Sequence, residues 1–186
     1  MPVNCIIKLP FLSLVLLAII AASGCGSGAD GGGGSGPTWI DTTTGYTWQR
    51  VPPGAQYYIW REAVGYCKDL TLDGKSDWRL PTISELRTII RGCTATQPGG
   101  ACNVTDSCLL STCWSEATCR SCKTGEGPAG GVFWDSNLDG FGGAYWSISP
   151  WTYTSGVGAW RVGFGDGSVD NANLEYITAS IRCVRN

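Results

Sequence analysis

The sequence predicts an α+β domain in which two short strands precede two helices, a long cysteine-rich loop and a C-terminal antiparallel sheet. Apolar residues recur at spacings of three and four in two segments and alternate in several others. Six cysteines crowd into a segment that shows neither period. The 186 residues, 43% hydrophobic and 15% charged, are enough for one core and too few for two.

The first strands and the first helix are expected between residues 38 and 70. Thr38–Ile40 and Tyr46–Gln49 flank a turn that ends at Gly45, which is typical of a pair of strands. From Tyr58 to Leu70 the apolar residues share one face of an amphipathic helix. They are Ile59, Ala63, Tyr66, Cys67 and Leu70. Cys67 is therefore expected on the core side.

A second helix is expected after Thr82, which stands three residues before Glu85 in the pattern of a capping box. The periodicity predicts that this helix runs to about Arg91. Its buried face would carry Ile83, Leu86 and Ile90.

The C-terminal sheet is expected to contain four strands. They are Tyr145–Ser149, Gly158–Phe164, Ser168–Asp170 and Ile177–Val184. Gly165-Asp166-Gly167 is typical of a hairpin turn. Most tryptophans of so small a domain must pack in its core, and we expect this of Trp48, Trp60, Trp78, Trp146 and Trp160.

Residues 1–24 have the pattern of a signal peptide, with Lys8 ahead of an apolar run too short to span a bilayer. Ala22-Ser23-Gly24-Cys25 resembles a bacterial lipobox, which implies a lipid on Cys25 and a membrane as partner. The alternative is an ordinary secretory signal cleaved near Ala22. Residues 25–37 form a Gly-rich tether, and residues 38–186 form the domain. Gly26 resembles the sorting position of outer-membrane lipoproteins, which implies an outer-membrane protein facing the periplasm or the cell surface.

Eight cysteines remain once Cys5 in the leader and Cys25 are set aside. They are Cys67, Cys93, Cys102, Cys108, Cys113, Cys119, Cys122 and Cys183. An even count in an exported protein predicts four disulfides. Six of the eight cysteines would form disulfides within the loop between residues 93 and 122. We pair the remaining two, Cys67 and Cys183, with each other. The alternatives are a zinc or redox site at the C-x-x-C of Cys119 and Cys122.

Several segments resemble the Lcl C-terminal domain family, named for the C-terminal domain of the Legionella collagen-like protein and related to the Fibrobacter succinogenes major paralogous domain. They are residues 41–49, 60–67, 77–86, 145–147, 160–164 and 181–185, with Trp78-Arg79-Leu80-Pro81-Thr82 the most specific. The resemblance implies a C-type-lectin-like fold, with a helix cysteine bonded to one on the last strand. It also implies surface or periplasmic binding, with glycans or glycosaminoglycans as ligands of some members. Calcium-dependent lectins bind the ion through a Glu-Pro-Asn or Gln-Pro-Asp triplet and a Trp-Asn-Asp triplet. This chain has only Gln97-Pro98-Gly99 and Trp146-Ser147-Ile148, so the resemblance does not extend to that calcium site.

Two sets of residues are candidates for ligand contacts. Asp135, Asn137 and Asp139 fit the start of a calcium loop, although an Asx-rich turn explains the same residues. Trp134, Trp151 and Tyr153 lie in or beside predicted loops, where aromatic faces would stack on sugars; core packing is the alternative.

The resemblance implies a binding or adhesion module, and the composition weighs against an enzyme. The chain has no His, which excludes catalysis by a His side chain. Its net charge of −2 argues against nucleic-acid binding, which needs a basic surface. Asp77 and Glu85 are expected to have structural roles around the second helix instead of forming a catalytic pair. The rival functions are an enzyme with the related formylglycine-generating-enzyme fold and a structural envelope lipoprotein.

Overall fold

The computed structural model describes residues 36–54, 56–153 and 156–186. The predicted signal peptide, the candidate anchor Cys25 and nearly all of the predicted tether lie outside these residues. The described residues belong to one compact unit. Within the described ranges, no helix is both long and apolar enough to cross a bilayer.

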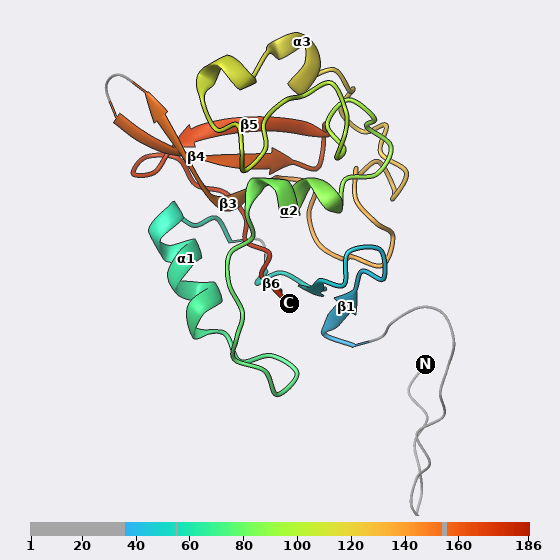
Figure 1. Ribbon diagram of the computed structural model, residues 1–186. Coiled ribbons are helices and arrows are strands. Elements are labelled where there is room, and N and C mark those ends of the chain that lie inside the picture. Colours follow the sequence, from blue (N-terminus) through green and yellow to red (C-terminus); the bar gives the residue numbers. More distant parts are fainter. Residues whose placement is uncertain (1–35, 55, 154–155) are drawn as a thin grey trace, which may run out of the picture. The chain divides into compact units, whose positions relative to one another are not determined.

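The first sheet is small and joins the two ends of the domain. Strands β1 (Thr38–Ile40) and β2 (Thr47–Gln49) form the expected antiparallel pair. The last strand, β6 (Val184–Arg185), pairs with the free edge of β2, which gives the order β1-β2-β6 (Figure 1). The β2–β6 pairing therefore closes the fold.

The second sheet contains three antiparallel strands in chain order. These are β3 (Ala144–Tyr153), β4 (Gly156–Gly163) and β5 (Ser168–Asn173). The register of β3 on β4 shifts between Trp146 and Pro150. The predicted hairpin turn connects β4 to β5, where Gly167 adopts a φ of +66° that favours glycine.

The strand expected over Ile177–Val184 is wrong except at its last residue. Ala179 forms one bridge with Tyr58, and Ser180 forms one with Tyr145. The segment crosses between the two sheets. Its apolar residues alternate because some of them are buried in the core, and the segment is not a strand of the second sheet. The predicted single C-terminal sheet is therefore two sheets.

Both predicted helices are present. Helix α1 (Trp60–Asp69) buries Ala63 and Cys67 as expected. Helix α2 (Ile83–Thr88) begins with the predicted capping box, in which Glu85 N–H donates to Thr82 Oγ1 over 3.2 Å. The helix is shorter than predicted because Arg91 N–H donates to Phe133 O, which draws the chain away from the helical path.

The two helices cover opposite faces of the second sheet, since successive strand residues alternate between two clusters. On one face Trp160, Val162 and Phe164 share a cluster with residues of α2. On the other face Trp146 and Ala159 share a cluster with residues of α1. Four of the five tryptophans expected in the core are at most 3% exposed, and Trp60 is partly buried.

All eight cysteines of the domain are oxidised. Cys67 on α1 bonds to Cys183, next to β6, as expected. Three further bonds staple the loop, where a 3₁₀ turn (Ser111–Cys113) and helix α3 (Glu116–Cys119) interrupt the irregular chain. They are Cys93–Cys122, Cys102–Cys119 and Cys108–Cys113. The two cysteines of the C-x-x-C therefore have different partners and hold no zinc.

Among the described residues, two buried arginines donate hydrogen bonds to backbone carbonyl groups instead of to a carboxylate. Arg87, 2% exposed, donates from its side chain to the carbonyl oxygens of Thr96, Gln97 and Val104. Arg182, 0% exposed, donates to Asp139 O over 2.6 Å and to the backbone oxygens of Gln49, which ends β2, and of Arg50. Burial lowers the pKa of both guanidinium groups.

Candidate functional site

An open polar pocket of about 330 Å³ lies beside the turn-bearing end of β4 and β5. Its lining comes from the end of the stapled loop, the residues that lead into β3, and the β4–β5 hairpin. These residues are Arg120, Thr124, Gly142, Gly143, Ala144, Arg161, Gly163, Gly165, Asp166, Ser168 and Asp170. A pocket of this size accommodates a group of one or two sugar rings.

Asp170 organises the cationic side of the pocket. Its Oδ2 accepts from Nη2 of Arg161 over 3.4 Å and also from Nη2 of Arg120. Arg161 faces Asp170 directly across the β4–β5 ladder, whereas Arg120 reaches over from the end of α3. The hydrogen bond to Asp170 raises the pKa of Arg120. One carboxylate therefore holds two guanidinium groups at the pocket wall.

The two arginines keep capacity for further hydrogen bonds. The side chain of Arg120 is 44% exposed and that of Arg161 is 22% exposed. Among the described residues, Nε of Arg161 is buried and has no hydrogen-bond partner. On the acidic side, Asp166 Oδ1 accepts from the backbone N–H and the hydroxyl of Ser168. The pocket thus combines charged donors with carboxylate acceptors.

Glycines form part of the pocket wall because side chains there would collide with its neighbours. A Cβ on Gly163 would lie 2.5 Å from Asp166 Oδ1, and one on Gly165 would lie 2.4 Å from Gly142 O. These contacts are far below normal van der Waals separation. Neighbouring atoms of the protein therefore already fill the space where these side chains would lie, so close packing of the pocket wall requires glycine at both positions.

The candidate calcium residues have other partners. Asp135 Oδ1 accepts from the backbone and side-chain N–H groups of Asn137, and its Oδ2 pairs with Arg91 at 3.3 Å. Asp139 pairs with Arg50 at 3.0 Å. No cluster of three His, Cys, Asp or Glu side chains suited to a metal occurs among the described residues. An Asx turn with two ion pairs accounts for this segment.

Of the three candidate aromatic residues, Trp134 belongs to the core. It is 3% exposed, and Arg182 stacks over its ring at 4.8 Å. The expectation of an exposed Trp134 is wrong, because the buried cation fixes the ring from inside. Trp151 is partly buried against Trp160, with ring centroids 6.4 Å apart. Tyr153 ends β3, and its side chain lies outside the described residues.

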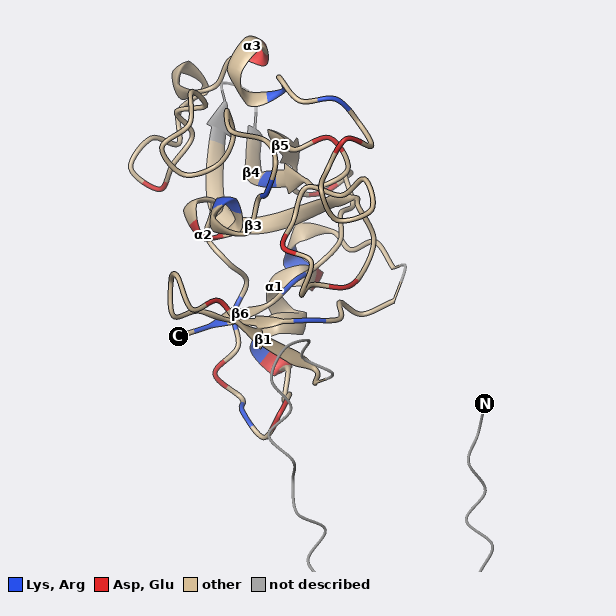
Figure 2. Cartoon of the chain, turned by 90° about the vertical axis from the view of Figure 1, so that its right-hand side faces the viewer, with Lys and Arg blue, Asp and Glu red and all other residues tan. Residues whose placement is uncertain are grey.

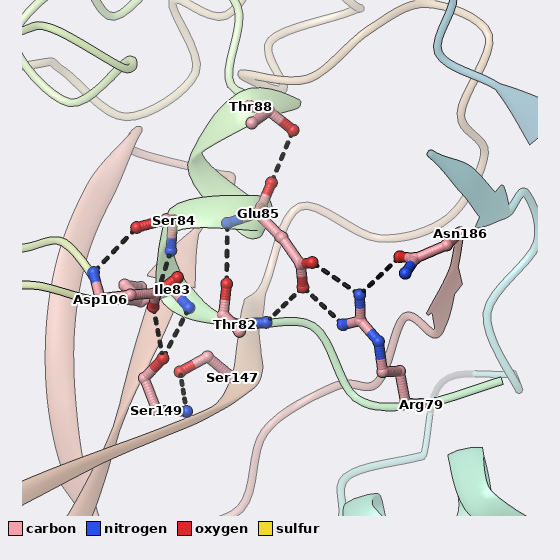
Figure 3. Close-up of polar contacts among 10 residues, drawn as sticks. All are labelled: Arg79, Thr82, Ile83, Ser84, Glu85, Thr88, Asp106, Ser147, Ser149 and Asn186. Carbon is pink, nitrogen blue, oxygen red and sulfur yellow. Dashed lines mark hydrogen bonds and ion pairs between the residues drawn. The ribbon is translucent and has the colours of Figure 1, made fainter. Parts of the chain in front are cut away.

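The carboxylates of Asp77 and Glu85 serve the fold (Figure 3). Glu85 accepts two hydrogen bonds from Arg79, at 2.6 and 2.7 Å, and one from Thr82 N–H at 2.8 Å. Asp77 pairs separately with Arg185, which lowers the pKa of Asp77. Ser149 and Asp106 satisfy the other free N–H groups at the start of α2. The Trp-Arg-Leu-Pro-Thr block is thus a capping structure.

Sequence reasoning missed the polar pocket, although part of its signal was present. With Gly165–Gly167 assigned as the turn, the hairpin register places Arg161 opposite Asp170, an opposite-charge cross-strand pair. Arg120 lies 50 residues from Asp170 along the chain. No local pattern connects them, because the disulfides of the loop bring Arg120 there.

The chain matches the Lcl C-terminal domain over residues 37–185, which is nearly all of the described domain. It therefore belongs to the Lcl C-terminal domain family. A search of curated proteins finds no match.

Proposed function

We propose that this chain is an extracytoplasmic lipoprotein whose domain binds a glycan in the polar pocket formed by Arg120, Arg161 and Asp170. The observation that carries the proposal is the presence of guanidinium donors and carboxylate acceptors on one open wall beside bare glycine backbone. Sugar hydroxyl groups donate and accept hydrogen bonds at once, so they match such a wall.

The charge balance favours a neutral or weakly acidic glycan over a glycosaminoglycan. Two arginines in the pocket are offset by Asp166 and Asp170. Basic and acidic residues are interspersed elsewhere in the domain (Figure 2). A polyanion would instead require an uncompensated basic surface.

Four disulfides support a location outside the cytoplasm, since reducing compartments rarely retain such bonds. The lipid at Cys25 rests on the lipobox pattern. Labelling growing cells with a radioactive fatty acid should mark the chain and fail to mark the Cys25→Ala variant. Equal labelling of both would remove the anchor from the proposal.

A glycan array probed with the oxidised domain, residues 36–186, tests the binding function. We expect saturable binding that persists in a chelator, because no cation is needed in the pocket. Arg161→Gln should weaken binding about tenfold or more, the value of a charged hydrogen bond. The matched control is Arg185→Gln, which removes the same charge from the distant ion pair with Asp77.

Different array results would count against the proposal. Equal binding by the Arg161→Gln variant and the wild type would move the ligand away from the pocket. A blank array with intact disulfides would contradict glycan binding and favour a structural role in the envelope.

A further inference from the structure

Three exposed apolar side chains lie together near the point where the tether joins the domain. Val51, Tyr57 and Phe141 are 53%, 54% and 52% exposed. We call them the tether-side surface. The rings of Tyr57 and Phe141 are half-exposed and contact each other. Adjacent exposed apolar side chains of this kind mark contact sites.

A chain of contacts connects this surface to Pro37, at the start of the described residues. Arg50 N–H donates to Pro37 O, which brings the adjacent Val51 beside the start of β1. A Cβ on Gly140 would lie 2.7 Å from the ring of Pro52, so the segment before Phe141 packs on the residue after Val51. The rings of Phe141 and Tyr57 then meet edge to face, with centroids 6.2 Å apart.

The length of the tether limits how far this surface can be from a membrane. Eleven residues lead from Cys25 to Gly36. Fully extended, they span at most about 40 Å. With a lipid on Cys25, every point of the tether-side surface therefore stays within reach of the bilayer.

We propose that Val51, Tyr57 and Phe141 form a membrane-contacting surface, on which the domain rests against the bilayer that holds its lipid. This inference depends on the lipid anchor of the proposed function. Aromatic rings are favoured at the level of lipid headgroups. Because the tether makes the contact intramolecular, with an effective concentration in the millimolar range, three side chains suffice for a contact too weak to hold a free protein.

The contact is apolar rather than electrostatic. Arg50 precedes Val51 in the chain, and its guanidinium is paired with Asp139 at 3.0 Å. We therefore expect no requirement for anionic lipid. The free domain, without its tether, should bind vesicles weakly whatever their charge.

Hydroxyl-radical footprinting of a vesicle-tethered chain tests the proposal without relying on lipidation in cells. In residues 25–186 the eight other cysteines are all in disulfides, so the Cys25 thiol can be coupled to maleimide lipid. Vesicles of phosphatidylcholine, with and without phosphatidylglycerol, serve as the surface. The reference is the same chain with Cys25 blocked, mixed with uncoupled vesicles so that radical scavenging by lipid is equal.

On tethering, oxidation of Tyr57 and Phe141 should fall about threefold or more in both lipid mixtures, as for side chains moved into the interface. Leu110 in the stapled loop and Val157 on β4, 64% and 59% exposed, should be oxidised at unchanged rates. In the Tyr57→Ser/Phe141→Ser variant, Val51 should keep its solution rate. Intact disulfides, checked by mass, show that this variant has folded.

Three results would overturn the inference. Unchanged oxidation of Tyr57 and Phe141 on tethering would show that the surface faces solvent. Protection that appears in solution and grows with protein concentration would identify a second copy of the chain as the occupant. Equal protection of Leu110 would indicate general shielding by the vesicle. Because coupling is chemical, these outcomes are independent of whether cells acylate Cys25.

Discussion

Removal of the Cys67–Cys183 disulfide should cost this domain more stability than removal of a loop disulfide. The two cysteines are 116 residues apart. The loop-entropy relation gives about 4.8 kcal/mol for a closed loop of that length. The Cys93–Cys122 bond spans 29 residues inside this loop and shortens the path through it. The expected cost then becomes about 4.6 kcal/mol.

The matched comparison is the Cys108–Cys113 bond, which closes only 5 residues. The same relation gives about 2.1 kcal/mol for it. Both cysteines of each pair are replaced by Ala, and urea unfolding is followed by tryptophan fluorescence. Globular domains typically have a free energy of unfolding of about 5–15 kcal/mol, so the variant without the Cys67–Cys183 bond would lose a large part of it.

Equal losses for the two pairs would refute the reasoning, because loop entropy would then not set the stabilisation. A change in the slope of the unfolding transition would instead indicate that the unfolded state had altered. Mass spectrometry must show that the six remaining cysteines keep their native partners in each variant.

Two further predictions concern buried polar groups. Arg87→Met should destabilise the domain by about 3 kcal/mol, because three carbonyl oxygens lose their donor. Arg185→Met, which removes an ion pair with the exposed Asp77, should change the urea midpoint only slightly. Similar urea midpoints for the two variants would contradict a supporting role for Arg87. Burial raises the pKa of Tyr145 above its usual value, so stability should be unaffected below about pH 10 and should fall as the pH rises further, since only the unfolded chain then loses this proton readily. Tyr145→Phe should flatten that alkaline decline in urea midpoints, and an unchanged slope would exclude Tyr145 as its source.

Local patterns predicted the elements whose residues interact with near neighbours in the chain. The capping box of Thr82 and Glu85, the apolar face of α1 and the hairpin turn at Gly165–Gly167 all have periods or motifs of a few residues. Family resemblance reached further, since it implied the bond between a helix cysteine and one near the C-terminus.

Long-range contacts account for the wrong predictions. The segment before β6 alternates like a strand, but its two bridges lead to Tyr58 and Tyr145 in different parts of the fold. Trp134 lies in or beside a predicted loop, which suggested exposure, yet the buried guanidinium of Arg182 stacks over its ring in the core. Neither partner can be identified from the residues nearby.

The sequence by itself determined the α+β class, the family, the even set of eight oxidised cysteines and the helices α1 and α2, because each depends on composition, short spacing or a specific motif. Only the tertiary structure decided the pairing within the stapled loop and the division into two sheets. It also decided the meeting of Arg120 with Arg161 and Asp170. Each of these features joins residues that are distant along the chain. The same local patterns allow many such contacts, and packing and disulfide formation select the ones that occur.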